Sequence, residues 1–334
     1  AKAIKSELMT SKDYKKMVSF ESISDIISYL KQKEGYRELL KDIDPAMVHR
    51  GKIEQILTNS IYITYTKLYQ FAKIKQRKSI QILFYRYEIH FIKYCLQKIL
   101  HEDVEMDLSL FKDFFDKHSN IDVEKMQNCT SMEDLIKCLE KTPYAKVLKE
   151  VRQFHNPSLF DYQMQLDIYY FQNIWKIKDK ILSGNERKSY TEILGNQIDM
   201  LNIMWIYRFK AFYNTDYGKI MTSVIPIQYK LTKKNITKMI EAISPEELIG
   251  IVKKTHYKRL FKENNIRKEE IESVFYKNMY ELFQKVSREN EMSIIPIQFL
   301  LYRKEREVDL LTTVLECIRY GLTEEDSMRI IEGM

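Results

Sequence analysis

Apolar positions recur along most of the chain at helical spacing, and three stretches carry them in nearly the same arrangement. In each stretch a Met precedes a Ser by five residues, an acidic residue follows the Ser by three, and an apolar group then leads to a Tyr. The three stretches are Met17–Ser22–Asp25–Tyr36, Met126–Ser131–Asp134–Tyr144 and Met239–Ser244–Glu247–Tyr257. Ser followed by an acid at this spacing is typical of a helix N-terminus, because the hydroxyl accepts a backbone N–H and the acid reaches back to the cap. The pattern predicts helix starts at Ser22, Ser131 and Ser244.

The spacing of these starts indicates an internal repeat. Ser131 follows Ser22 by 109 residues, and Ser244 follows Ser131 by 113. One capped helix is common in any protein, whereas three at matched spacing indicate repeated modules. We therefore predict three similar helical modules, covering residues 1–110, 111–220 and 221–334.

Long amphipathic helices follow the capped start in every module. Apolar side chains at three- and four-residue intervals predict helices over 51–75, 79–99, 166–177, 191–213, 271–286 and 297–320. Modules with so few helices usually bury their remaining apolar surface against their neighbours. Three of them could do so as an open solenoid or as a closed ring with a hollow.

The composition favours an all-α fold. Only 8 Gly and 6 Pro occur in 334 residues, which argues against a turn-rich β fold and suits long helices. No apolar run reaches the roughly 18–20 residues that a membrane-spanning helix needs, and no secretory signal is visible. We expect a soluble, cytoplasmic protein.

The charge leaves the partner open. A net charge of +7 is compatible with nucleic acid, an anionic membrane surface or an acidic protein. A basic cluster follows several aromatic residues, as in some single-strand channels: Lys73, Lys75, Arg77 and Lys78 follow Tyr65, Tyr69 and Phe71. However, these aromatics are spaced helically among Ile and Leu, which is more simply explained by a buried apolar helix face whose basic end is exposed to solvent.

The residues that usually carry chemistry form no recognisable site. The four cysteines lack a C-x-x-C pair, so they indicate neither zinc nor a disulfide framework, and we interpret them as reduced, buried packing residues. The six histidines lack metal-ligand spacing, and no phosphate loop or nucleophile motif is present. The sequence therefore predicts no catalytic, cofactor-binding or metal-binding residue.

One segment, residues 296–311, points to a known family. It resembles a run in the C subunit of the A/V-type ATPases, the counterpart of the d subunit in the eukaryotic vacuolar pump, and Lys304, Glu305, Glu307 and Val308 fit its Lys-Glu-x-Glu-Ile/Val part. A second helix of that family is similar at Ile198, Leu201, Asn202 and Arg208. The opening at 8–14 and the ending at 318–325 are also similar, so the resemblance covers essentially the whole chain.

This resemblance implies three similar three-helix bundles around a pseudo-threefold axis, funnel-shaped with a central hollow. It implies a non-catalytic rotor subunit, whose mouth takes the central-stalk subunits D and F and whose base caps the membrane proteolipid ring. The chain would be peripheral to the membrane, would bind no nucleic acid or small-molecule substrate, and would be a monomer when isolated. The alternatives are a helical-repeat scaffold with an unrelated partner and an RNA-binding helical protein.

The third helix of each module carries charged or amide positions opposite its apolar stripe. We expect these positions to line the funnel or to pair between modules; they are Glu88, Asn202, Arg208, Lys304, Glu305 and Glu307. Buried pairing would make single substitutions strongly destabilising. Wall positions would change stalk affinity and its salt dependence instead.

Overall fold

A computed structural model describes residues 6–48, 50–100, 107–213, 216–261 and 270–333. These residues form helices and connecting segments without any strand, so the predicted all-α class is confirmed. No helix among them is both long enough and apolar enough to cross a membrane. The chain divides into two compact units, one of residues 1–159 with 297–332 and the other of residues 160–296 with the last two residues.

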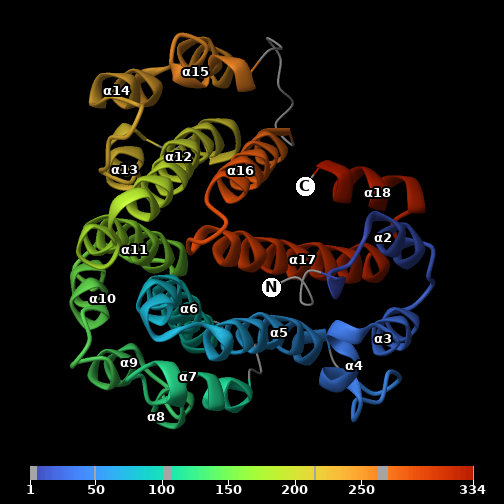
Figure 1. Ribbon diagram of the computed structural model, residues 1–334. Coiled ribbons are helices and arrows are strands. Elements are labelled where there is room, and N and C mark those ends of the chain that lie inside the picture. The colour runs from blue at the N-terminus through green and yellow to red at the C-terminus, as the bar shows by residue number, and fades with distance from the viewer. Residues whose placement is uncertain (1–5, 49, 101–106, 214–215, 262–269, 334) are drawn as a thin grey trace. The chain divides into compact units, whose positions relative to one another are not determined.

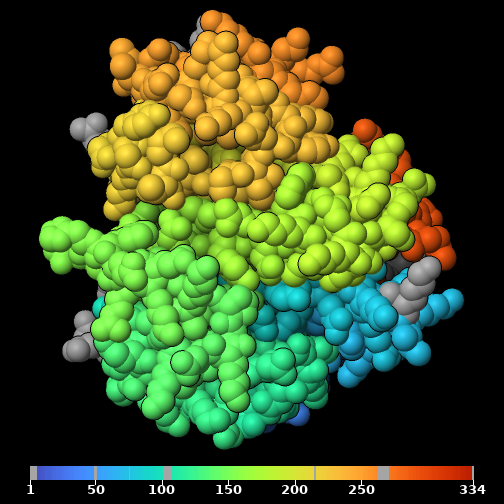
Figure 2. All heavy atoms as spheres, turned by 90° about the vertical axis from the view of Figure 1, so that its left-hand side faces the viewer, coloured from blue at the N-terminus to red at the C-terminus, as the bar shows by residue number. Residues whose placement is uncertain are grey.

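The first unit combines the beginning of the chain with its last helices, shown in blue and red in Figure 1. Its helices are α2 Ser11–Val18, α3 Ile23–Lys31, α4 Glu34–Leu40, α5 Arg50–Phe71, α6 Ile74–Leu100, the 3-10 helix η1 Leu108–Phe111, α7 Lys112–His118, α8 Val123–Gln127, α9 Met132–Cys138, α10 Tyr144–Arg152, α17 Ile295–Arg319 and α18 Glu324–Gly333. Within this unit α8, α9 and α10 form one continuous green face in the space-filling view (Figure 2).

Aromatic side chains form the centre of the first unit between α5, α6 and α7. The Tyr62 ring stacks on Phe114 at 4.4 Å between centroids, and Tyr65 packs edge-to-face on Tyr87 at 5.6 Å. Tyr65 is fully buried, as the predicted core stripe requires, whereas Phe71 at the end of α5 is 86% exposed. The stripe therefore ends before Phe71.

The turn between α5 and α6 gives one cation of the predicted basic cluster a structural role. The Arg77 guanidinium donates to the carbonyls of Tyr69 at 3.2 Å, Gln70 at 3.0 Å and Ala72 at 3.1 Å. Since the last carbonyls of a helix lack intrahelical partners, these bonds cap α5. The boundary comes earlier than predicted, with α5 ending at Phe71 and α6 beginning at Ile74.

The second unit is built around α12. Its helices are α11 Leu159–Ile181, which begins at the unit boundary, α12 Gly184–Arg208, the π-helical turn η2 Phe209–Tyr213, α13 Tyr217–Thr222, α14 Lys233–Glu241, α15 Pro245–Val252, the 3-10 helix η3 His256–Leu260 and α16 Glu270–Glu289. Helices α14, α15 and α16 all pack against α12. Gly195 on α12 permits one close approach, because a Cβ there would lie 2.3 Å from the Tyr229 ring.

The three predicted helix starts are confirmed. The hydroxyls of Ser22, Ser131 and Ser244 accept the backbone N–H groups of Asp25, Asp134 and Glu247 at 3.2, 3.1 and 3.2 Å. The acids differ in what they accept. Asp25 and Asp134 accept a hydrogen bond from the serine hydroxyl, whereas the longer Glu247 accepts from the Ile243 backbone N–H at 2.7 Å.

The first two capped helices end before the tyrosines of their stretches. The helix from Ser22 ends at Lys31, and α4 carries Tyr36. In the second module α9 ends at Cys138, and Pro143 lies at the N-cap of α10. Each of these two tyrosines therefore lies on a helix separate from the capped one.

Candidate functional site

The three tyrosines that end the repeated stretches each donate a hydrogen bond to a carboxylate on a long helix. Tyr36 donates to Glu307 Oε1 at 2.6 Å, Tyr144 to Glu88 Oε2 at 2.5 Å, and Tyr257 to Asp199 Oδ2 at 2.9 Å. All three tyrosines are buried. We call each pair, together with the other donors to its carboxylate, a junction.

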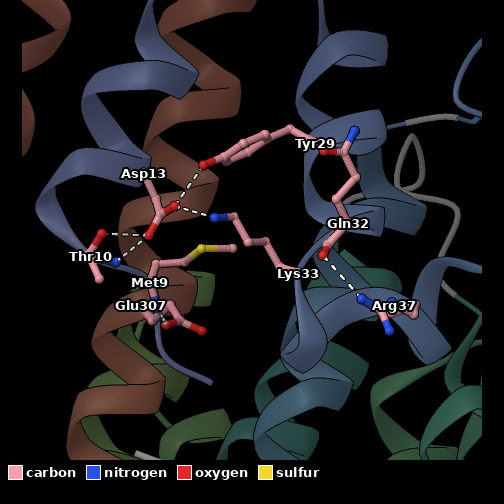
Figure 3. Close-up of polar contacts among 8 residues, drawn as sticks. All are labelled: Met9, Thr10, Asp13, Tyr29, Gln32, Lys33, Arg37 and Glu307. Atoms are coloured by element: carbon pink, nitrogen blue, oxygen red, sulfur yellow. Dashed lines mark hydrogen bonds and ion pairs between the residues drawn. The ribbon is translucent and has the colours of Figure 1, made fainter. Parts of the chain in front are cut away.

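The Tyr36–Glu307 junction is a buried ion pair with two further donors. Glu307 and Lys304 lie one turn apart on α17, and Lys304 Nζ is 2.7 Å from Glu307 Oε1. The ammonium also donates to the Tyr36 hydroxyl at 2.9 Å and lies 4.1 Å from the centre of the Tyr36 ring. The backbone N–H of Met9 donates to Glu307 Oε2 at 2.5 Å (Figure 3). The Glu307 carboxylate thus accepts from three donors. The Lys304 ammonium contacts the carboxylate, the Tyr36 hydroxyl and the Tyr36 ring.

Burial sets the protonation of this junction. Burial raises the pKa of Tyr36 well above its usual value, and the Glu307 charge raises it further, so Tyr36 is a neutral donor. Burial lowers the pKa of Lys304, and the Glu307 carboxylate opposes that shift. The carboxylate therefore favours the charged form of the ammonium, against the effect of burial.

A second polar cluster in the first unit fixes the helix that follows Met9 (Figure 3). Asp13 on α2 accepts from the Thr10 backbone N–H at 2.7 Å, the Thr10 hydroxyl at 2.6 Å and the Tyr29 hydroxyl at 2.7 Å. It also pairs with Lys33. Burial alone would raise the pKa of Asp13, but the hydrogen bonds from Lys33, Thr10 and Tyr29 outweigh it and hold the pKa well below its usual range. The cluster ties α2 to α3 and to the start of α4.

The Tyr144–Glu88 junction uses hydroxyl groups as its donors. Glu88 lies on α6 and is half-buried. The Ser119 hydroxyl, just after α7, donates to its Oε1, and Tyr144 at the start of α10 donates to its Oε2. Burial raises the pKa of Glu88, and the two hydroxyl groups oppose the shift.

The Tyr257–Asp199 junction lies in the second unit, and its carboxylate is fully buried on α12. The backbone N–H groups of Lys230 and Leu231, just before α14, donate to Asp199 Oδ2 at 2.7 and 3.0 Å. The Tyr257 hydroxyl is also 3.2 Å from Asn196 Oδ1. Burial raises the pKa of Asp199 and that of Tyr257.

Across the predicted modules the junctions follow a cyclic order. The tyrosine of residues 1–110 bonds the last long helix of residues 221–334, that of residues 111–220 bonds α6, and that of residues 221–334 bonds α12. Each carboxylate also takes a donor from just before a short opening helix. This donor is Met9 N before α2, Ser119 Oγ three residues before the α8 cap, or Lys230 N and Leu231 N before α14.

The other predicted site residues lie in separate contacts. Glu305 on α17 pairs with Arg86 on α6 at 3.1 Å. Asn202 is fully buried on α12, where it donates to the Ile225 carbonyl at 3.0 Å and accepts from the Ile225 N–H at 2.8 Å. Arg208 pairs with Glu272 at 2.7 Å, with both side chains about 40% exposed. Of the six residues only Lys304 and Glu307 share a junction, while Glu88 lies in another.

Sequence reasoning missed Asp199 and the role of the tyrosines. The tyrosines follow the capping serines by 14, 13 and 13 residues, so their equivalence could be found. The carboxylates follow the same serines by 66, 68 and 63 residues. The three carboxylates therefore do not lie at a fixed offset from the serines, and one of them belongs to an Asp where the other two belong to Glu.

The junctions hold chain segments together. Their tyrosines donate and their carboxylates accept from two or three groups each, so the hydrogen bonds favour one geometry. In the Tyr257–Asp199 junction these donors all bond Asp199 Oδ2, and the buried Asp199 Oδ1 has no hydrogen-bond partner among the described residues. No group of His, Cys, Asp and Glu among the described residues could hold a metal ion.

Comparison with known proteins gives a consistent family. The sequence model of the ATP synthase (C/AC39) subunit family matches residues 1–329. The C subunit of the A-type ATP synthase of Methanosphaera stadtmanae is 24% identical over 257 residues, which cover 75% of this chain and 63% of that protein. The corresponding C subunits of Methanocaldococcus jannaschii and Thermococcus kodakarensis are each 20% identical, over 90% and 97% of this chain and 76% and 86% of their own lengths.

Proposed function

Because this chain belongs to the ATP synthase (C/AC39) subunit family, we propose that it is a non-catalytic rotor subunit of an A/V-type ATPase. The family match over residues 1–329 is the observation that carries the proposal. The chain would bind the central-stalk subunits D and F on one side and the membrane proteolipid ring on the other. It would pass torque between ATP turnover and ion transport, and it would be peripheral to the membrane through the ring.

Such a role requires a stiff chain, and the junctions supply stiffness. Separation of α4 from α17 would take the Tyr36 hydroxyl away from the buried Glu307 carboxylate and Lys304 ammonium. A buried polar group that loses its partner is costly, so the Tyr36–Glu307 junction resists that separation. The long helices α5, α6, α11, α12, α16 and α17 contain Gly only at 51, 184 and 195 and Pro only at 296.

We further propose that the three modules close into a funnel-shaped ring around a pseudo-threefold axis. The cyclic order of the junctions supports this arrangement, because Tyr36 near the start of the chain bonds Glu307 near its end. An open solenoid would not require a bond between its first and last modules.

Purification of a tagged chain from its native membranes tests the rotor assignment. We expect the central-stalk subunits and the proteolipid to co-purify, and membranes that lack the chain to hydrolyse ATP without transporting ions. Recovery of the chain without other ATPase subunits, or ATP hydrolysis by the purified chain alone, would overturn the proposal.

A single hydroxyl tests the mechanical role of the junctions. Tyr144→Phe removes the bond to Glu88 and keeps the ring in place. We expect fewer ions to be transported per ATP hydrolysed, with stalk binding unchanged. The reason is that a chain without this hydrogen bond would deform under torque and transmit less of it. The matched control is Tyr217→Phe, whose side chain is 49% exposed. Equal coupling ratios in the two variants would argue against the junction as a mechanical element.

A further inference from the structure

We propose that Cys129 and Cys138 form a reversible disulfide within the chain, so that the segment joining α8 to α9 is a site of oxidative modification. Cys129 follows α8 by two residues, and Cys138 is the last residue of α9. Their Sγ atoms are 3.4 Å apart. The two residues lie on either side of the Ser131 cap.

The geometry needs only a small movement. A disulfide places its sulfurs about 2.05 Å apart, so the two Sγ atoms must approach by little more than an ångström. The Cys129 thiol is held in place by a contact with the Lys125 carbonyl at 3.4 Å. The side chains are therefore already directed toward each other.

The two thiols differ in access to solvent. Cys138 is exposed, whereas Cys129, Cys95 and Cys317 are buried. This corrects the interpretation of all four cysteines as buried packing residues. A dissolved oxidant consequently meets Cys138 first.

The reaction balances with a small-molecule disulfide, such as oxidised glutathione, as the oxidant. The Cys138 thiolate attacks one sulfur of glutathione disulfide, which forms a mixed disulfide and releases one glutathione thiolate. Cys129 then loses its proton and attacks the Cys138 sulfur, which releases the second glutathione. The protein loses two hydrogens and two electrons, and one glutathione disulfide becomes two thiols.

Burial of Cys129 slows the second step at neutral pH. Burial raises the pKa of Cys129 to about 12, and its contact with the Cys138 sulfur contributes to the shift. Only a small fraction of Cys129 is therefore thiolate, and that fraction grows as the pH rises toward 12. The mixed disulfide on Cys138 should resolve faster at higher pH.

The disulfide would link the segment before the Ser131 cap to the end of α9, next to the Tyr144–Glu88 junction. Helix α9 packs against α8 and against α6, and Lys98 on α6 donates to the Gln127 carbonyl at the end of α8. Helix α6 also carries Glu88. Oxidation would thus restrict the two short helices that lie beside the Tyr144–Glu88 junction.

The experiment exposes the folded full-length chain to oxidised glutathione and measures its intact mass, its count of alkylatable thiols after unfolding and a peptide map. We expect the thiol count to fall from four to two, a Cys129–Cys138 cross-link in the map, and full recovery on reduction. Oxidised protein should melt at a higher temperature than reduced protein. Cys317→Ser, which changes a buried cysteine outside the pair, should form the same cross-link.

Two variants separate the possible results. Cys129→Ser should keep a stable glutathione adduct on Cys138, and Cys138→Ser should resist oxidation at Cys129. Four free thiols in treated wild-type protein, a lasting mixed disulfide that does not resolve at raised pH, or a bond to Cys95 or to a second chain would each overturn the proposal.

Discussion

One tyrosine in each repeated stretch donates a hydrogen bond to a carboxylate, although the surrounding groups differ; the three are Tyr36, Tyr144 and Tyr257. Each donates to a buried or half-buried carboxylate, yet only the first junction includes an ion pair on the same helix. The sequence could predict that Lys304 and Glu307 pair, because residues three apart on a helix are neighbours. It could not predict Tyr36 or Met9 N as their partners, because these lie 271 and 298 residues from Glu307.

Removing the ammonium from the first junction should be strongly destabilising. Lys304→Met leaves the buried Glu307 carboxylate without its cation, at a cost of about 3–5 kcal/mol. Chemical denaturation measures the change. The double variant Lys304→Met/Glu307→Leu should regain part of the loss, because no unpaired charge remains.

The control is Lys146→Met, which removes an exposed ion pair with Glu150 and should change the free energy of unfolding by less than about 1 kcal/mol. If Lys304→Met behaves like this control, the ion pair contributes nothing to the first unit.

Asp13 should make stability fall in acid. Its pKa is held below the usual value of 3.8 by the hydrogen bonds from Lys33, Thr10 and Tyr29, against the effect of burial. A depressed folded-state pKa adds stability that is complete above the unfolded value and is lost as the pH falls below 3.8. Asp13→Asn should therefore be less stable than wild type at neutral pH, and the difference should shrink below pH 3.8.

Thermal melting of both proteins as a function of pH measures this difference. The exposed Asp42 supplies the control, Asp42→Asn. A constant difference between Asp13→Asn and wild type down to strongly acid pH would contradict the assigned role.

At the scale of helices, local signals predicted where elements begin better than where they end. The serine caps depend on residues three apart and were predicted from the sequence. The end of α5 depends on Arg77, which reaches back from α6 to three carbonyls. A helix end that is fixed by such a side-chain donor cannot be predicted from the spacing of apolar residues.

The three capping serines should make similar contributions to stability. Ser22→Ala, Ser131→Ala and Ser244→Ala each remove one bond to a backbone N–H and should lower the free energy of unfolding by about 1 kcal/mol. Chemical denaturation gives the three values. The control is Ser28→Ala, on the exposed face of α3, which should be neutral or slightly stabilising. A loss of ATPase coupling without a loss of stability would show a further role for these serines.

Two helical glycines should respond in opposite directions to the same substitution. In Gly195→Ala the new Cβ would lie 2.3 Å from the Tyr229 ring, and the displacement should cost about 1–3 kcal/mol. In Gly250→Ala no atom lies within 4 Å of the new Cβ, so the helix propensity of Ala should add up to about 1 kcal/mol. Melting temperatures that move in the same direction would contradict this difference.

For the whole molecule, composition and periodicity were sufficient for the all-α class, and the family followed from residues spread over the chain. The two compact units were not predictable in the same way. Helix α17 falls in residues 221–334 by repeat counting, yet most of it belongs to the first unit, where its Glu305 and Glu307 meet Arg86 and Tyr36. The division into three modules and the funnel stay predictions.

A truncated chain should show this dependence. A fragment of residues 1–296 lacks α17, so Tyr36, Met9 N and Arg86 lose their acceptors. We expect the first unit to be open to proteolysis in the fragment, while residues 160–296 keep their helical content by circular dichroism. Addition of a peptide of residues 297–334 should restore protection, and a peptide with Glu307→Gln should do so less well. Equal protection with and without the peptide would show that the first unit folds without its last helices.

The membership of α17 and α18 in the first unit also determines when the protein can be completed during its synthesis. Residues 6–159 leave the ribosome long before the helices at 297–332 that fold with them. Until α17 has been synthesised, the hydroxyl of Tyr36 and the backbone N–H of Met9 have no Glu307 to bind, so the nascent first unit stays incomplete. A ribosome that stops early consequently releases a chain whose first unit is unfinished.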